Sequence, residues 1–223
     1  MRKLITGAFL SLDGVLQAPG GPTEDPTRGF AHGGWVVPHM DEALGAEIDL
    51  WFREPYDLLL GRKTYEIFAA HWPYAEGGQD DAIAVQFNKI NKYVATRSGD
   101  VDTSWKGSVA LRDAATDVAK LKKEDGPNLV TQGSGDLIQT LLAHDLVDEI
   151  HTITFPIVLG NGKKLFGEGA KPAGLKLLSH GVTPMGVTVA RYARTGDVEV
   201  GDYALETPSE AEVKRQERMK REG

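Results

Sequence analysis

The chain has 223 residues, of which 25 are basic and 32 acidic, giving a net charge of −7. This balance argues against a protein that coats nucleic acid, because phosphate binding needs a basic surface. The chain contains no cysteine, which excludes disulfides, thiolate metal sites and cysteine nucleophiles and fits a reducing cytoplasm. Its apolar runs are too short for a membrane helix, and its start lacks the pattern of a signal peptide. We therefore expect a cytoplasmic protein with neither nucleic-acid nor membrane partners.

Strands and helices alternate along most of the chain, and many of its 26 glycines lie between them. A strand over 2–12 leads into a loop rich in glycine and proline at 13–38. Apolar residues at helical spacing then predict a helix over 39–53. Further strands are predicted at 57–60, 92–96, 128–131 and 150–158, and further helices at 63–71, 80–91, 112–123 and 137–143. This alternation indicates an α/β domain with a largely parallel central sheet.

The last third of the chain changes character. Residues 187–192 and 198–200 alternate between apolar and polar around a turn at 195–197, which predicts a terminal antiparallel hairpin. We expect one domain over residues 1–205, followed by a charged tail at 206–223. In this tail Ser209 and Glu212 match a capping box, which predicts a helix. That helix is either solvated or packed against a partner subunit.

Three polar motifs follow predicted strands. The first opens the helix at 63–71 with two cations and a hydroxyl, Gly61-Arg62-Lys63-Thr64. The second repeats the order of strand, glycine turn and helix, Gln132-Gly133-Ser134-Gly135-Asp136-Leu137. The third ends the strand at 92–96, Thr96-Arg97-Ser98. Each alone is explained by an ordinary helix start or polar loop. Because free helical N–H groups suit anions and open α/β sheets bind ligands at the carboxyl ends of strands, together they indicate a phosphorylated dinucleotide.

Other ligand-binding patterns are missing from the sequence. In the second motif Ile138 stands where the Rossmann fingerprint needs its third glycine. No two of the six histidines have the i, i+4 spacing of a helical zinc pair. Gly162-Lys163 is followed by Lys164 rather than by the hydroxyl residue of a P-loop. We therefore expect anion recognition without a metal.

Two features point to a substrate site. Ser11-Leu12-Asp13-Gly14 closes the first strand, and the Asp13 carboxylate is a candidate to orient a polar substrate or relay a proton. The same residues also fit a simple Asp-Gly turn. Trp35, in the loop at 13–38, either stacks on a heteroaromatic ring or anchors the loop to the core. Ser11, Asp13 and Trp35 are the candidate substrate contacts, with Asp13 the candidate catalytic group.

The order of these motifs resembles the dihydrofolate reductase-like superfamily over about residues 1–194. The closer likeness is to the reductase domain of riboflavin biosynthesis and its stand-alone relatives. It is carried by Ser11-Leu12-Asp13-Gly14, Gly61-Arg62-Lys63-Thr64-Tyr65, Gly133-Ser134-Gly135-Asp136-Leu137, and Leu146-Val147-Asp148-Glu149-Ile150 with Pro156-Ile157-Val158-Leu159-Gly160 and Lys164-Leu165-Phe166. The resemblance implies a three-layer α/β/α fold whose mostly parallel sheet ends in an antiparallel C-terminal hairpin.

The resemblance also implies hydride transfer from NADPH to a small heterocyclic or carbonyl substrate. By position, residues 62–64 would contact the 2′-phosphate and diphosphate, residues 96–98 would flank the adenosine phosphate, and residues 133–137 would cap the diphosphate. Asp13 would lie in the substrate site, and the family implies a homodimer built through the sheet and C-terminal strands. Folate reductases carry an acid on the helix before the glycine-arginine motif. The matching place here is near Ile48, so reduction of dihydrofolate is not expected.

Two other functions stay open. A dinucleotide-binding module or dimeric interaction protein without chemistry would keep the same anion motifs, and the charged tail would then be its functional end. A phosphoester hydrolase would need a nucleophile or a metal set, for which the sequence offers no candidate.

Overall fold

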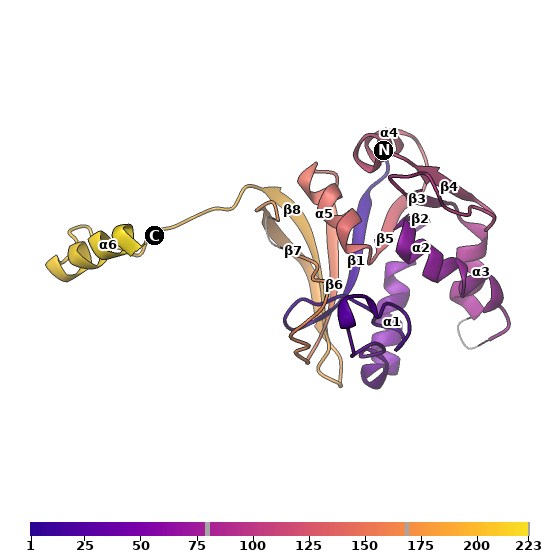
Figure 1. Cartoon of the computed structure of the whole chain (residues 1–223), viewed down its shortest axis with the longest axis horizontal. Coiled ribbons are helices and arrows are strands. Elements are labelled where there is room, and N and C mark those ends of the chain that lie inside the picture. Colours follow the sequence, from indigo (N-terminus) through magenta and orange to yellow (C-terminus); the bar gives the residue numbers. More distant parts are fainter. Residues whose placement is uncertain (79–80, 168–169, 223) are drawn as a thin grey trace.

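One mixed sheet forms the centre of the protein (Figure 1). The computed structural model describes residues 1–78, 81–167 and 170–222. In this part of the chain eight strands lie in the order β4-β3-β2-β5-β1-β6-β8-β7. The six strands from β4 to β6 run parallel, whereas β8 and β7 continue the sheet antiparallel. The strands are β1 (Leu4–Ser11), β2 (Tyr56–Gly61), β3 (Lys92–Ala95), β4 (Ser108–Leu111), β5 (Asn128–Gln132), β6 (Glu149–Phe155), β7 (Gly174–Val182) and β8 (Thr188–Gly196).

Helices cover both faces of this sheet, which gives the three-layer α/β/α fold that was expected. Buried side chains of α4 and α5 pack on one face, and those of α1, α2 and α3 pack on the other. The helices are α1 (Glu42–Trp51), α2 (Arg62–Ala69), α3 (Asp81–Lys89), α4 (Ala114–Lys123), α5 (Gly135–Ala143) and α6 (Glu210–Glu222). None of the helices in the described ranges is long and apolar enough to cross a membrane.

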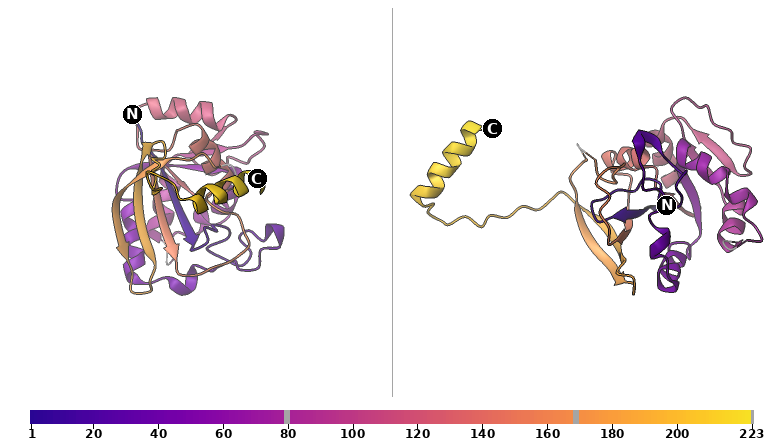
Figure 2. Two further views of the ribbon diagram at one scale, coloured as in Figure 1. Left: turned by 90° about the vertical axis from the view of Figure 1, so that its left-hand side faces the viewer. Right: turned by 60° about the horizontal axis from the view of Figure 1, so that its bottom comes forward.

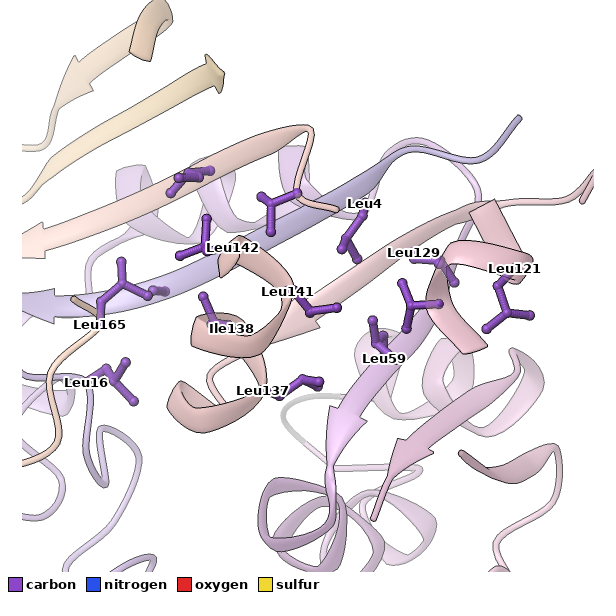
Figure 3. Packing of buried hydrophobic residues seen from close by; sticks show 14 of the residues in the cluster. Leu4, Leu16, Leu59, Leu121, Leu129, Leu137, Ile138, Leu141, Leu142 and Leu165 are labelled. Atoms are coloured by element: carbon purple, nitrogen blue, oxygen red, sulfur yellow. The ribbon is translucent and has the colours of Figure 1, made fainter. Parts of the chain in front are cut away.

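The central strands are apolar without interruption because helices bury both of their faces. Leu58, Leu59 and Leu60 of β2 are all fully buried. Successive side chains of a strand point to opposite faces, so Leu59 joins the cluster under α4 and α5 while Leu58 and Leu60 face α2 and α3. Figure 3 shows the first of these clusters, in which the leucines of α5 meet those of β1, β2 and β5.

Local chemistry explains where the predicted elements begin and end. The helix expected over 39–53 starts at Glu42, because the Asp41 carboxylate accepts a hydrogen bond from Leu44 N at 2.7 Å. The strand expected over 150–158 ends at Phe155, because Pro156 has no N–H to continue the ladder. The helix expected at 112–123 likewise starts one residue after its cap, Asp113.

The C-terminal hairpin is present, and the strand predicted at 187–192 lies in β8, but the predicted turn at 195–197 and second strand at 198–200 are wrong. Its strands are β7 and β8, joined by the turn at 183–187, whereas residues 198–200 form no strand. Thr183 N donates to Val187 O, and Gly186 takes a φ of +76° to close this turn. Residues 188–196 stay extended because β8 pairs with β6 on one side and with β7 on the other. Strand β7 was not predicted, since a bulge between Leu177 and Ser179 interrupts its alternation.

The tail contains the predicted helix. Glu212 N donates to Ser209 Oγ at 3.2 Å, so the cap of α6 is formed. No residue of α6 is buried. Figures 1 and 2 show α6 standing away from the sheet at the end of an extended segment. The division into a domain over 1–205 and a tail stays a prediction.

The burial of Lys92 makes the stability of the protein depend on pH. Its side chain is fully buried, and Nζ donates to Phe87 O at 2.9 Å and lies 4.3 Å from the centroid of the Trp105 ring. Burial lowers the pKa of Lys92 to about 8, against the opposing effect of the Asp57 carboxylate. The folded state therefore binds fewer protons than the unfolded chain between about pH 8 and 10.5, the ordinary pKa of a lysine side chain.

We expect the stability of the native protein, relative to a Lys92→Met variant, to rise across this pH window by up to about 3 kcal/mol. Urea unfolding of both proteins at several pH values measures this difference. A difference that does not change with pH would show that the ammonium group is equally stable in the folded and unfolded states.

Candidate cofactor and substrate cleft

A cleft of about 1430 Å³ lies at the carboxyl ends of the parallel strands. Chain segments that are far apart in the sequence meet there, because parallel strands end at the same edge of a sheet. All the residues predicted to bind the cofactor line this cleft: Gly61, Arg62, Lys63, Thr64, Thr96, Arg97, Ser98, Gln132, Gly133, Ser134, Gly135, Asp136 and Leu137. The three polar motifs therefore belong to one site.

Two helices start at this cleft without a side-chain cap. Gly61, the N-cap of α2, has no side chain, and Ser134, the N-cap of α5, makes no capping hydrogen bond. The first-turn N–H groups of both helices are thus left to an external acceptor, at the positive ends of the helix dipoles. In contrast, the Asp113 carboxylate caps α4 by accepting from Thr116 N at 3.1 Å. The starts of α2 and α5 therefore form a part of the cleft that is suited to an anion, here called the anion-binding part.

The two residues before α5 have left-handed backbone conformations. Gly133 has a φ of +64° and Ser134 a φ of +62°, which turns the chain sharply from β5 into α5. A Cβ on Gly133 would meet no atom within 4 Å, so its positive φ, rather than crowding, favours glycine there. The open space above Gly133 allows a ligand to approach the backbone.

Ser134 joins the two helix starts. Its Oγ accepts a hydrogen bond from Gly61 N at 2.8 Å and donates one to Thr64 Oγ1 at 2.7 Å. A Cβ on Gly61 would lie 3.1 Å from Ser134 Cβ and Oγ, which is tighter than an ordinary contact. Glycine at position 61 thus permits the close approach of two motifs that the sequence presents separately.

Cationic side chains surround this anion-binding region. Arg62 Nη1 lies 2.6 Å from Glu66 Oε1, so part of its charge is neutralised within α2. Arg112 also lines the cleft, at the end of β4, and was not predicted because β4 itself was not. A Cβ on Gly99 would lie 2.9 Å from Arg112 Cζ, so the guanidinium lies against the loop that follows Arg97 and Ser98.

An apolar and aromatic region adjoins the anion-binding part of the cleft. It is lined by Gly7, Phe9, Trp51, Ile67 and Phe68. The rings of Phe9 and Trp51 stack with their centroids 5.8 Å apart. A Cβ on Gly7 would lie 2.6 Å from Trp51 Cζ3, so the indole lies directly on the backbone of β1. Trp51 was predicted only as an apolar residue of its helix, and its place in the cleft follows from this contact.

The long loop between β1 and α1 contributes one side of the cleft. Gln17 Nε2 donates to the carbonyl oxygens of Asp25 and Thr27, and Gln17 Oε1 accepts from Lys163 N at 3.0 Å. Lys163 Nζ also lies 2.5 Å from Asp25 Oδ2. Glu24 lines the cleft as well, and burial raises the pKa of its carboxyl group even though Gly20 N donates to it. The loop is therefore held in one conformation by its own polar contacts.

The roles predicted for Ser11 and Asp13 at the substrate stay predictions. Neither residue lines the cleft. The Asp13 carboxylate accepts hydrogen bonds from Ser11 Oγ, Leu159 N and Gly160 N at 2.7, 3.0 and 2.9 Å. The Ser11 hydroxyl and these N–H groups lower the pKa of Asp13 to about 2. Its charge therefore ties the end of β1 to the segment after β6.

Trp35 also lies outside the cleft lining, contrary to the stacking role considered for it. It is buried, its Nε1 donates to Gln17 O at 2.8 Å, and its ring meets Phe155 edge to face. Trp35 thus anchors the loop to the core, which was the alternative expectation. Glu47 and Asp49, the acidic residues beside Ile48, do not line the cleft either. Glu47 faces Arg191, with its Oε2 4.0 Å from Arg191 Nη2.

The sheet and its covering helices have the dihydrofolate reductase-like α/β architecture. Residues 2–189 match the model of the RibD C-terminal domain, and the chain belongs to this family. Two relatives in Bacillus subtilis (strain 168) are the uncharacterized proteins YyaP and YwjB. YyaP is 25% identical over 198 residues, covering 87% of this chain and 96% of YyaP. YwjB is 26% identical over 179 residues, covering 79% of this chain and 89% of YwjB.

Solved structures share the fold at lower identity. A protein of Shewanella sp. PV-4 described as a riboflavin biosynthesis protein aligns with a TM-score of 0.54 and 22% identity, covering 86% of this chain and 99% of that one. A pyrimidine reductase-like protein of Corynebacterium diphtheriae aligns with a TM-score of 0.57 and 14% identity, covering 88% of this chain and 93% of that one. Dihydrofolate reductase of Enterococcus faecalis, complexed with NADP(H), aligns with a TM-score of 0.55 and 13% identity, covering 86% of this chain and 96% of that one.

The hydrogen bonds of Asp13 lead to a prediction about stability. Asp13→Asn should lower the melting temperature at neutral pH, because an amide is a weaker acceptor for the three donors than a carboxylate. The loss should shrink as the pH falls toward 2, where the native carboxyl group is itself protonated. Thermal unfolding monitored by circular dichroism tests this. Unchanged stability together with lost turnover would instead support the catalytic role.

The ion pair of Arg62 provides a matched pair of variants. Arg62→Ala should weaken NADPH binding by about 1–3 kcal/mol if the guanidinium makes a charge-assisted hydrogen bond to the cofactor. Glu66→Gln should leave binding unchanged or tighten it, because it removes only the carboxylate that neutralises Arg62. Fluorescence titration with NADPH measures both. Equal weakening in the two variants would indicate a general disturbance of α2.

Proposed function

We propose that this protein is an NADPH-dependent reductase that transfers a hydride to a small heterocyclic or carbonyl substrate. The observation that carries the proposal is the pairing of two uncapped helix starts with an aromatic region in one cleft. The first part suits a diphosphate, and the second suits flat rings. Membership of the RibD C-terminal domain family and the fold shared with reductases support it.

The residues present fit the proposed cofactor. The N–H groups at the starts of α2 and α5 would bind the diphosphate, with the sharp turn at Gly133 giving it access to the backbone. Arg62, Lys63 and Arg97 would supply positive charge for the extra phosphate that distinguishes NADPH from NADH. When bound, NADPH supplies the hydride. The protein contributes binding, orientation and exclusion of water.

The substrate would lie against the aromatic region formed by Phe9 and Trp51, under the loop between β1 and α1. Among the cleft acids of that loop, Asp25 pairs with Lys163, whereas Glu24 Oε2 accepts only backbone hydrogen bonds, from Gly20 N and Gly21 N, among the described residues. Burial raises the pKa of Glu24, and this carboxyl group is the acid of the loop that we propose as a polar contact for the substrate. We also place the protein in the cytoplasm, whose reducing conditions suit a chain without cysteine.

Cofactor titration tests this proposal directly. We expect NADPH to bind with a sub-millimolar dissociation constant and NADH to bind more weakly, because only NADPH carries the 2′-phosphate that the cations would contact. Fluorescence of the reduced nicotinamide measures both constants. Absence of binding at sub-millimolar NADPH would refute the reductase. Tight binding without NADPH oxidation by any pteridine, pyrimidine or carbonyl compound tested would favour the alternative of a silent dinucleotide-binding module.

A further inference from the structure

A second cavity, of about 480 Å³, lies apart from the cleft. Residues 65–74, from α2 and the turn that follows it, form one wall, and residues 102–106, from the segment between β3 and β4, form the other. Among the described residues none lines both this cavity and the cleft. Its volume falls within the range of small-ligand pockets, roughly 300–1,000 Å³. The proposed reductase leaves this cavity without a role.

Three aromatic rings line this cavity, those of Tyr65, Tyr74 and Trp105. Tyr65 and Trp105 are buried, with their ring centroids 5.9 Å apart. Their polar atoms are already paired within the protein. The Tyr65 hydroxyl donates to Ser108 Oγ at 3.0 Å, and Trp105 Nε1 donates to Asn88 Oδ1 at 2.7 Å. Tyr74, in contrast, is 82% exposed. The rings therefore offer carbon surface to the apolar body of a ligand.

Carboxylates belong to both walls of the cavity, Glu66 to α2 and Asp102 to the segment before β4. Among the described residues, each accepts a hydrogen bond through one oxygen only. Glu66 Oε1 accepts from Arg62 Nη1 at 2.6 Å, and Asp102 Oδ1 accepts from Ser104 N at 2.8 Å. The second oxygen of each carboxylate is left for a ligand. Lys106 is the one cation of this described lining, so carboxylates outnumber cations there.

We propose that this cavity binds a small organic cation with a flat apolar body, of the class of aromatic amidines and guanidines. The carboxylates of Glu66 and Asp102 bind the charged group, and the aromatic rings hold the flat body. The charge lies at the carboxylates rather than against Trp105, because Lys92 Nζ is already 4.3 Å from the centroid of that ring. A neutral molecule of the same shape gains only the contact with the rings.

Glu66 connects this cavity to the cleft. It lines the cavity, and its carboxylate pairs with Arg62, which lines the cleft. A ligand cation at Glu66 weakens this ion pair and leaves the Arg62 guanidinium free for a phosphate. Binding at each site therefore strengthens binding at the other, and the effect is small because both side chains of the pair are partly exposed. This coupling, unlike the cavity itself, rests on the proposed binding of NADPH.

Nuclear magnetic resonance of the tryptophan indole N–H groups tests the site, because Trp105 lines the cavity and Trp51 lines the cleft. Trp105→Phe and Trp51→Phe assign the two signals. Benzamidine should shift the Trp105 signal saturably, with a millimolar dissociation constant, and leave the Trp51 signal in place. Benzamide, which is neutral and has the same shape, should bind at least tenfold more weakly. Equal binding of the two compounds, no saturable shift, or a shift at Trp51 as large as at Trp105 would overturn the proposal.

Charge-removing variants locate the cation within the cavity. Asp102→Asn and Glu66→Gln should each raise the dissociation constant for benzamidine at least threefold, since each removes one carboxylate of the lining. Glu42→Gln is the matched control, because Glu42 is an exposed acid at the start of α1 and lines neither the cavity nor the cleft. It should leave the constant unchanged. An equal effect of all three variants would show that only the total charge of the protein matters, and would overturn the site.

A second titration tests the coupling. Saturating benzamidine should lower the dissociation constant for NADPH about twofold in the native protein and leave it unchanged in Glu66→Gln, as measured by fluorescence of the reduced nicotinamide. An unchanged constant in the native protein would overturn the coupling. Failure of NADPH to bind at all would refute the proposed reductase and the coupling with it, whereas the Trp105 signal decides on the cation site by itself.

Discussion

Ser134 Oγ accepts a hydrogen bond from Gly61 N and donates one to Thr64 Oγ1, and the cleft is built around these two bonds. They hold the start of α2 against the start of α5, so that two sets of unpaired helical N–H groups face the same space. A Cβ at position 61 would lie only 3.1 Å from Ser134 Cβ and Oγ, so Ser134 would have to shift slightly. The close approach of the two helix starts therefore uses one hydroxyl group and a residue without a side chain.

The rest of the cleft depends on a loop that is ordered by its own contacts. Asp13 and Trp35 do not line the cleft, but both contact segments of the chain that surround it. The carboxylate holds the segment after β6, and the indole joins the loop to Phe155. With Gln17 and the Lys163–Asp25 pair, these contacts hold the loop that brings Glu24 to the lining of the cleft.

The part of the chain that matches the family ends at residue 189, within β8. Residues 197–206 and α6 lie beyond it. Residues 197–206 carry four large apolar side chains that stay exposed, those of Val198, Val200, Tyr203 and Leu205. This segment therefore contributes no buried side chain to the core around which the cleft is built.

The sequence by itself determined the alternation of strands and helices, the capping box at the start of α6, and the three polar motifs. These features are local, since they depend on residues a few positions apart. Tertiary structure alone decided the rest. Strands β4 and β7 exist because of the strands beside them, and Arg112 and Trp51 reach the cleft through contacts with Gly99 and Gly7. Likewise, the hydrogen-bond partners of Asp13 and Trp35 lie far from them in the sequence or follow from the path of the loop, so local pattern could not reveal them.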